Sequence, residues 1–457
     1  METNRTTGSV FKNVLFFSLP YLLSYFLQTL YGMADLFIVG QYENVAATTA
    51  VSVGSQVMHM LTVMIVGLAM GSTVSIGQSV GGGDKARTSY AIGNTVTLFM
   101  ALSLVLTGIL LFSVRGIVSV MSTPEDAVSG TVSYLTVCFI GIPFITAYNI
   151  ISSIYRGIGD SKSPLYFVAV ACAANIALDF LFMGALRLGP VGAALGTTLS
   201  QALSVVTALC AIVKTKSGIT LKKEHLRPQK SVVGQLLRIG IPVALQDGLI
   251  QVGFIVITII ANRRGLDDAA AVGIVEKVIG FLFLVPSSML STVSALGAQN
   301  IGAGKPERAK KTLYYAMALT STFGILITIL VQFTAEPIVA LFTDQNAADG
   351  ARVVLLGGQY FRGYILDCLL AGVHFCFSGY FCARGRSKLS FLHNIISLLL
   401  MRIPGAYFAS KLFPDTLFPM GLATAFGSLI SVIVCLIAYT ALCRGDKREN
   451  SVKGAAS

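Results

Sequence analysis

Acidic side chains inside apolar segments are the first residues of this 457-residue sequence that point to chemistry. Asp35 and Asp179 each lie within a long run of apolar residues. If these runs cross a membrane, a charge at the bilayer centre costs about 2.5–3.5 kcal/mol even on the most lenient scale. Such acids should therefore face a cavity and have a function.

Helical spacing brings further polar residues onto the faces that carry these acids. The groups are Gln28, Tyr31 and Asp35 at i, i+3 and i+7, Asn175 and Asp179 at i and i+4, and Ala193 and Thr197 at i and i+4. Carboxylate, amide and hydroxyl oxygens are ligands for a hard cation such as Na⁺, and paired carboxylates hold a proton more tightly. The pattern predicts a site for Na⁺ or H⁺. The alternative is a buried hydrogen-bond network that only locks the helices together.

The composition supports a membrane location. Hydrophobic residues make up 54% of the chain and charged residues 12%, against roughly 45–50% and 25% in soluble domains, which excludes a soluble protein. A spanning helix needs about 20 apolar residues. Runs of that kind begin near Val14, Val51, Tyr90, Ala127, Leu165, Val191, Val232, Ala269, Leu313, Val353, Leu389 and Leu417. We therefore predict an all-α polytopic membrane protein of about twelve transmembrane helices, the first run being too long for a signal peptide.

The basic residues are distributed unevenly among the loops. The net charge of +12 would suit nucleic acid, but most of the 33 Lys and Arg residues cluster on alternate loops between the apolar runs. This asymmetry is typical of cytoplasmic loops. We expect a multi-pass protein of the inner or plasma membrane with both termini cytoplasmic, and no nucleic-acid partner. The eight cysteines lie in or at the ends of apolar runs, without a metal-binding spacing.

The two halves of the sequence resemble each other. GQSVGGGDKAR from Gly77 is echoed by AQNIGAGKPER from Ala298, and a basic stretch from Lys214 to Lys230 separates six runs from six. We predict an N-lobe (1–218) and a C-lobe (219–457) of six helices each, with a cytoplasmic linker near 214–230. Repeats of this kind are typical of transporters, with a pathway between the lobes.

Other residues indicate hinges and the absence of nucleotide binding. Pro20 and Pro242 lie inside the first and seventh runs, where each permits a bend, so we predict hinges there. The GAGK stretch at Gly302–Lys305 does not match a phosphate-binding loop, because glutamine replaces its first glycine and proline follows the lysine. Any transport should therefore be driven by an ion gradient, and the sequence shows no catalytic constellation.

Several longer segments together resemble the multidrug and toxic compound extrusion (MATE) family over essentially the whole chain. They are PYLLSYFLQTLYGMADLFIVGQY from Pro20, IYRGIGDSKSPL from Ile154, NIALDFLF from Asn175, GPVGAALGTT from Gly189 and AQNIGAGKPERA from Ala298. The resemblance implies two pseudo-symmetric six-helix bundles around a V-shaped cavity. It also implies exchange of Na⁺ or H⁺ for organic cations by alternating access, with no enzyme activity and no cofactor beyond the coupling ion.

The resemblance also implies roles for individual residues. One prokaryotic branch binds its ion through acids on the first and fifth helices with neighbouring amides and a threonine, a pattern that matches Asp35, Asn175, Asp179 and Thr197. That branch lines its substrate cavity at the positions of Gln28, Tyr31, Tyr134 and Asn149. Asp367 is similar to a tenth-helix acid of another branch's C-lobe ion site, and Asp367 and Gln251 are the candidates for such a site here. The sequence departs from that branch at this point, because the branch has a glutamate near where Ile250 and Gln251 stand.

We therefore expect a secondary antiporter that exports cationic or amphipathic small molecules in exchange for Na⁺ or H⁺ by alternating access. Its expected partners are those molecules and membrane lipids, and we expect a monomer. A flippase for a lipid-linked precursor is the alternative; it predicts a more basic cavity, whereas the embedded residues here are mainly acidic. A structural or receptor-like membrane protein would show no transport at all.

Overall fold

The computed structural model describes residues 5–214, 222–343 and 350–455, and within these ranges the regular structure is helical. Eleven helical segments are long and apolar enough to cross a membrane. The pair α4 (Glu125–Ile140) and α5 (Ile142–Gly157), bent by 48°, passes the same test as one broken span. The prediction of an all-α protein with about twelve spans is confirmed.

Apart from α4 and α5, the helices of the first half are long. In chain order they are α1 (Val10–Tyr42), α2 (Val45–Gly81), α3 (Lys85–Val120), α6 (Lys162–Asp179) with a π-helical continuation at Phe180–Ala185, and α7 (Gly189–Lys214). Polar side chains begin several of them. Asn44 accepts a hydrogen bond from the amide of Ala47 at the start of α2, and Asp84 accepts one from Arg87 at the start of α3.

The second half contains more broken spans. A 3₁₀ turn at Lys223–Leu226 is followed by α8 (Lys230–Asn262), α9 (Leu266–Leu282), α10 (Leu284–Gly302), α11 (Pro306–Ala340), α12 (Gly350–Tyr364), α13 (Leu366–Ala383), α14 (Ser387–Ser397), a π-helical turn at Leu398–Arg402, α15 (Ile403–Leu412) and α16 (Phe418–Ala455). Large apolar side chains such as Phe112 on α3 and Phe333 on α11 are exposed. A lipid-facing surface requires such side chains.

Backbone contacts divide the chain into two compact units. Unit 1 comprises Met1–Ala244 with Ala298–Ala309, and unit 2 comprises Leu245–Gly297 with Lys310–Ser457. The division falls within α8, shortly after Pro242. The lobes at 1–218 and 219–457 stay a prediction, as does the linker near 214–230, of which residues 215–221 lie outside the described ranges.

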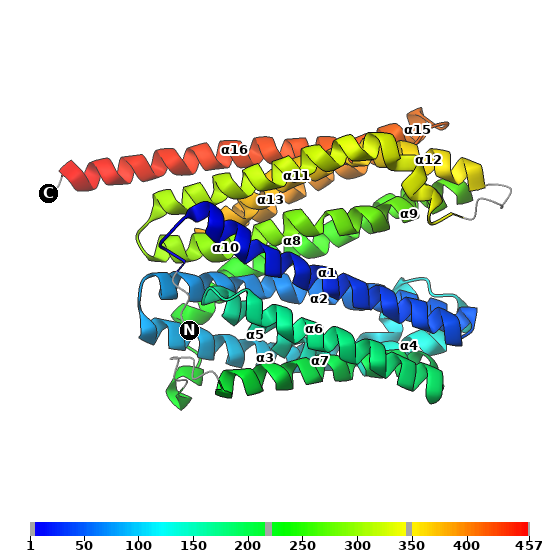
Figure 1. Ribbon diagram of the computed structural model, residues 1–457, viewed down its shortest axis with the longest axis horizontal. Coiled ribbons are helices and arrows are strands. Elements are labelled where there is room, and N and C mark those ends of the chain that lie inside the picture. Colours follow the sequence, from blue (N-terminus) through cyan, green and yellow to red (C-terminus); the bar gives the residue numbers. More distant parts are fainter. Residues whose placement is uncertain (1–4, 215–221, 344–349, 456–457) are drawn as a thin grey trace. The chain divides into compact units, whose positions relative to one another are not determined.

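In unit 1, α2 packs against α1, α3, α4, α5 and α7. Helix α1 also packs against α6, and α6 packs against α7. Figure 1 shows α1, α2 and α6 side by side. This packing brings together the three helices that carry Asp35, Asp179 and Thr197.

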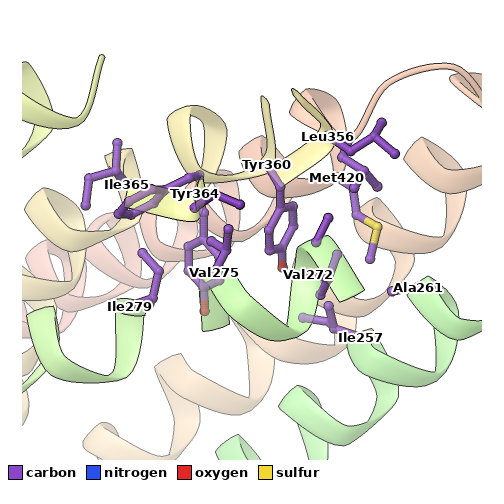
Figure 2. Close-up of a cluster of buried hydrophobic side chains, with 14 of the residues drawn as sticks. Ile257, Ala261, Val272, Val275, Ile279, Leu356, Tyr360, Tyr364, Ile365 and Met420 are labelled. Atoms are coloured by element: carbon purple, nitrogen blue, oxygen red, sulfur yellow. The ribbon is translucent and has the colours of Figure 1, made fainter. Parts of the chain in front are cut away.

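In unit 2, the core forms where α12 meets α9, α8 and α16. Tyr360 and Tyr364 of α12 are fully buried against apolar residues of the other helices, among them Val275 of α9, Ile257 of α8 and Met420 of α16 (Figure 2). The helix α16 also packs against α13, α14 and α15. It therefore holds the short helices of this unit in place.

The two copies of the glycine-rich motif meet inside unit 1. Gly81 of the first copy packs against the carbonyl oxygen of Gln299, and Gly302 of the second packs against the carbonyl oxygen of Gln78. The side-chain amide of Gln299 also donates to the carbonyl of Gly157 at 2.9 Å. At both glycines a Cβ atom would overlap the facing carbonyl, so this reciprocal motif contact has room for glycine only.

Gly302→Ala should therefore destabilise the protein by about 1–3 kcal/mol, the usual cost of overpacking. Gly234→Ala is the matched control, since Gly234 lies in α8 with nothing within 4 Å of an added Cβ. The control should be neutral or gain up to about 1 kcal/mol from helix propensity. Thermal unfolding of the purified proteins measures the difference, and equal stability of the two variants would contradict the close contact.

Candidate functional site

The face of α1 that carries Asp35 points into unit 1. Asp35 is 4% exposed and Asp179 is fully buried. The hydroxyl of Thr197 on α7 donates to Asp35 Oδ2 at 3.2 Å. The Asp35 carboxyl group also interacts with the side chains of Asp179 and Asn175 on α6. Three helices thus bring all four predicted ion-site residues into one cluster.

Several polar atoms of this cluster have no protein partner. Apart from the contacts of these three side chains with one another, no described group donates a hydrogen bond to Asp35 Oδ1, to either oxygen of Asp179 or to the side-chain oxygen of Asn175. Buried polar atoms are nearly always paired, and two adjacent carboxylates resist being ionised together. The arrangement suits a shared proton or one small cation with oxygen ligands.

The site offers two carboxylates and neutral oxygens. In the part of the chain that the structure describes, no group of three or more His, Cys, Asp and Glu residues is placed to hold a metal ion. A tightly bound transition metal usually takes nitrogen or sulfur ligands. The donors at Asp35 and Asp179 are instead oxygen atoms, the ligands that hard cations prefer.

Two of the four residues predicted to line a cavity, Gln28 and Tyr31, lie further along the α1 face that carries Asp35. Gln201 donates to the hydroxyl of Tyr31 at 3.3 Å, and Gln28 donates to the hydroxyl of Tyr148 at 3.4 Å. On α4, the hydroxyl of Tyr134 forms a hydrogen bond of 3.1 Å with the hydroxyl of Ser55. Hydroxyl and amide groups therefore continue from the acid pair along α1.

Asn149 differs from the other predicted cavity residues. It is 6% exposed, and its side-chain amide donates to the carbonyl of Ile145 in its own helix at 2.8 Å. The sequence reasoning also missed two residues of this region, Gln201 and Tyr148. Gln201 lies one helical turn after Thr197, so its spacing was a usable signal. Tyr148 gave none. The cavity-lining roles stay predictions.

Gly196 supports the position of Asp179. It lies in α7, and a Cβ there would overlap Asp179 Oδ1. Helix α7 can approach α6 this closely because the residue is glycine. The GxxxG spacing from Gly192 to Gly196 therefore matters for the acid pair as well as for packing.

Gly196→Ala should displace the Asp179 carboxyl group. If the ion-coupled export predicted from the sequence depends on this acid, the substitution should slow that export by about tenfold or more, because small misplacements at a functional site have large kinetic effects. Gly108→Ala is the control, since a Cβ at Gly108 in α3 meets nothing within 4 Å. Efflux of a fluorescent organic cation, normalised to the amount of membrane protein, measures both variants. Full activity in Gly196→Ala would show that the position of Asp179 is unimportant.

In unit 2 the structure pairs Asp367 with an arginine. Asp367 is fully buried, and both of its oxygens accept hydrogen bonds from Arg402 Nη2, at 3.1 and 2.9 Å. The same nitrogen donates to Ser428 at 2.7 Å, and Ser428 also bonds to His374. A guanidinium thus stands where a coupling cation would sit. The C-lobe ion site at Asp367 and Gln251 stays a prediction.

The two predicted hinges lie inside continuous helices. Pro20 is in α1 and Pro242 is in α8. The hydroxyl of Ser24 donates to the carbonyl of Pro20 at 2.8 Å, a bond within the helix that commonly accompanies bending. Their role as hinges stays a prediction.

Comparison with known proteins gives the family. The MatE family model matches residues 20–181 and 242–408, one segment in each half. The chain belongs to the MATE family. The probable multidrug resistance protein YoeA of Bacillus subtilis is 29% identical over 75% of each chain, and the multidrug export protein MepA of Staphylococcus haemolyticus is 23% identical over 83% of each.

The fold of this MATE protein matches solved structures of the family. A multidrug resistance MATE family transporter of the MOP superfamily, solved in an outward-facing conformation, superposes with a TM-score of 0.88. Its sequence is 20% identical, and the match covers 96% of this chain and 98% of the other. The fold expected from the sequence resemblance is confirmed, and the chain is a multi-pass membrane protein of a transporter family.

Proposed function

We propose that this MATE protein is a secondary antiporter that exports cationic or amphipathic small molecules in exchange for Na⁺ or H⁺. The buried acid pair of Asp35 and Asp179, with carboxylate oxygens that lack a protein partner, is the observation that carries the proposal. The relatives named as multidrug resistance and export proteins support the substrate class. Those names favour drug export over a lipid-precursor flippase.

The coupling arises from competition for the same negative charge. An entering Na⁺ or H⁺ neutralises the acid pair, and the pair then attracts a cationic substrate less strongly. A ligand shifts the equilibrium between two conformations only through unequal affinity for them, so ion occupancy must change which conformation is stable. Bending of α1 near Pro20 provides the conformational step in this mechanism.

The proposed orientation follows from the loop charges. Both termini are cytoplasmic, and the protein works as a monomer in the inner or plasma membrane. Ions then enter from outside and substrates leave from the cytoplasmic side or from the inner leaflet. The expected partners are organic cations, amphipathic drugs and membrane lipids.

Ethidium binding to the purified protein tests the exchange mechanism. The affinity should fall as Na⁺ is added at constant ionic strength, or as the pH is lowered, whichever ion is coupled. Addition of K⁺ at the same concentrations controls for ionic strength. An ethidium affinity that neither Na⁺ nor pH alters would refute competition between substrate and ion.

A further inference from the structure

Arg156, the next-to-last residue of α5, has no role in the mechanism above. The residue is 6% exposed. Its guanidinium carbon lies 4.0 Å from the ring centroid of Tyr21. The phenols of Tyr21, Tyr25 and Tyr148 lie near it, and Tyr21 also forms a side-chain hydrogen bond with it. These phenols carry no charge at neutral pH, so a buried cation lies among neutral groups.

A buried charge in such surroundings calls for an explanation. Charges removed from water are normally paired or coordinated. The attraction between a tyrosine ring and a guanidinium is weaker than the penalty for removing that ion from water. The cluster formed by Arg156, Tyr21, Tyr25 and Tyr148, here called the arginine cage, is therefore well suited to receive an anion.

The arginine cage is connected to the acid pair along one helix face. Tyr21, Tyr25, Gln28, Tyr31 and Asp35 follow one another at spacings of three and four residues on α1. Gln28 donates to Tyr148 of the cage at 3.4 Å. Tyr25 and Asp35 are separated by about 15 Å along the helix at a rise of about 1.5 Å per residue. Polar groups therefore link a buried cation to a buried pair of acids.

The residue that follows Arg156 connects the cage to the glycine-rich motifs. Gly157, the residue after Arg156, packs against Ile76, and its carbonyl accepts the hydrogen bond from Gln299. The reciprocal motif contact is thus next to the cage.

We propose that the arginine cage binds the carboxylate of an amphipathic substrate whose cationic part lies toward Asp35 and Asp179. The planar guanidinium presents paired N–H donors that match a carboxylate, and Tyr25 and Tyr148 add hydroxyl groups beside it. The ring of Tyr21 holds the guanidinium plane. The inference rests on the proposed export function and names a substrate class within it, the zwitterionic amphiphiles.

Rhodamine B and its ethyl ester test this proposal, because the two dyes differ only in whether the carboxylate is free. Fluorescence anisotropy with the full-length protein in lipid nanodiscs gives both affinities. Wild type should bind rhodamine B more tightly than the ester. Arg156→Gln should weaken rhodamine B binding by about tenfold or more and leave ester binding unchanged. Arg115→Gln is the matched control, since Arg115 is an exposed arginine of α3.

Two results would overturn the proposal. Equal affinity of wild type for the two dyes, or binding of neither, would show that the protein does not recognise the carboxylate. An equal loss of affinity for both dyes in a folded Arg156→Gln variant would show that Arg156 only holds α5 against α1.

If Arg156→Gln does not fold, Arg156→Lys serves instead, because it keeps the charge and loses the paired donors. It should reduce the preference for rhodamine B, and an unchanged preference would count against the cage. The failure of this proposal and that of the antiporter proposal are distinguishable. A protein that prefers rhodamine B but shows no gradient-driven transport would refute the antiporter and support carboxylate binding by the arginine cage.

Discussion

Asp35→Asn should abolish export of an organic cation while the protein still inserts and folds. The substitution keeps the size of the side chain and its ability to accept from Thr197, which lies 3.2 Å from Asp35 Oδ2. It removes the charge, so the pair can no longer exchange one proton or Na⁺ for a substrate cation. Ethidium efflux from cells that lack other exporters should fall to the level of cells without the protein.

Asp84→Asn is the control for this experiment. Asp84 is exposed and caps α3 through the amide of Arg87, and asparagine caps helices equally well. The control should export normally at the same protein level. Undiminished export by Asp35→Asn would remove the acid pair from the mechanism.

Arg402→Gln should destabilise the protein by about 3–5 kcal/mol, because it leaves the fully buried Asp367 without its cationic partner. The side chain of Arg402 is 14% exposed, so water cannot replace it easily. Thermal unfolding of the purified protein measures the loss. The double variant Asp367→Asn with Arg402→Gln should recover part of the stability, since no unpaired charge remains.

Arg352→Gln provides the comparison with a surface ion pair. Arg352 lies 3.2 Å from Asp267 with its side chain 66% exposed, and such pairs contribute about 0–1 kcal/mol. Equal destabilisation by Arg352→Gln and Arg402→Gln would show that the buried ion pair contributes no more to stability than the surface pair.

The sequence was sufficient to predict the membrane spans and the acid cluster. Lipid offers no hydrogen bonds, so spanning segments must be long, apolar and helical. Each predicted run begins within, or one residue before, a candidate span of the structure, the bent pair α4 and α5 included. The same physics singled out Asp35 and Asp179, because an acid in an apolar run is costly. Their i+3, i+4 and i+7 neighbours followed from helix geometry.

Contacts between helices were less predictable. Arg402 and Asp367 lie on different helices, and no sequence spacing indicates that they pair. The fit of Gly196 against Asp179 and that of Gly302 against the Gln78 carbonyl depend on how closely two helices approach, which periodicity does not determine. The tyrosines around Arg156 come from α1 and α5, and no sequence spacing predicted that they lie near it.

Efflux from proteoliposomes tests ion-coupled export most directly. Purified protein is reconstituted with a fluorescent organic cation inside, and a Na⁺ gradient or a pH gradient is imposed separately. We predict efflux against the substrate gradient under one of the two ion gradients, and none when that gradient is collapsed by an ionophore. Efflux that is the same with and without ion gradients, or absent under both, would contradict the proposed antiport.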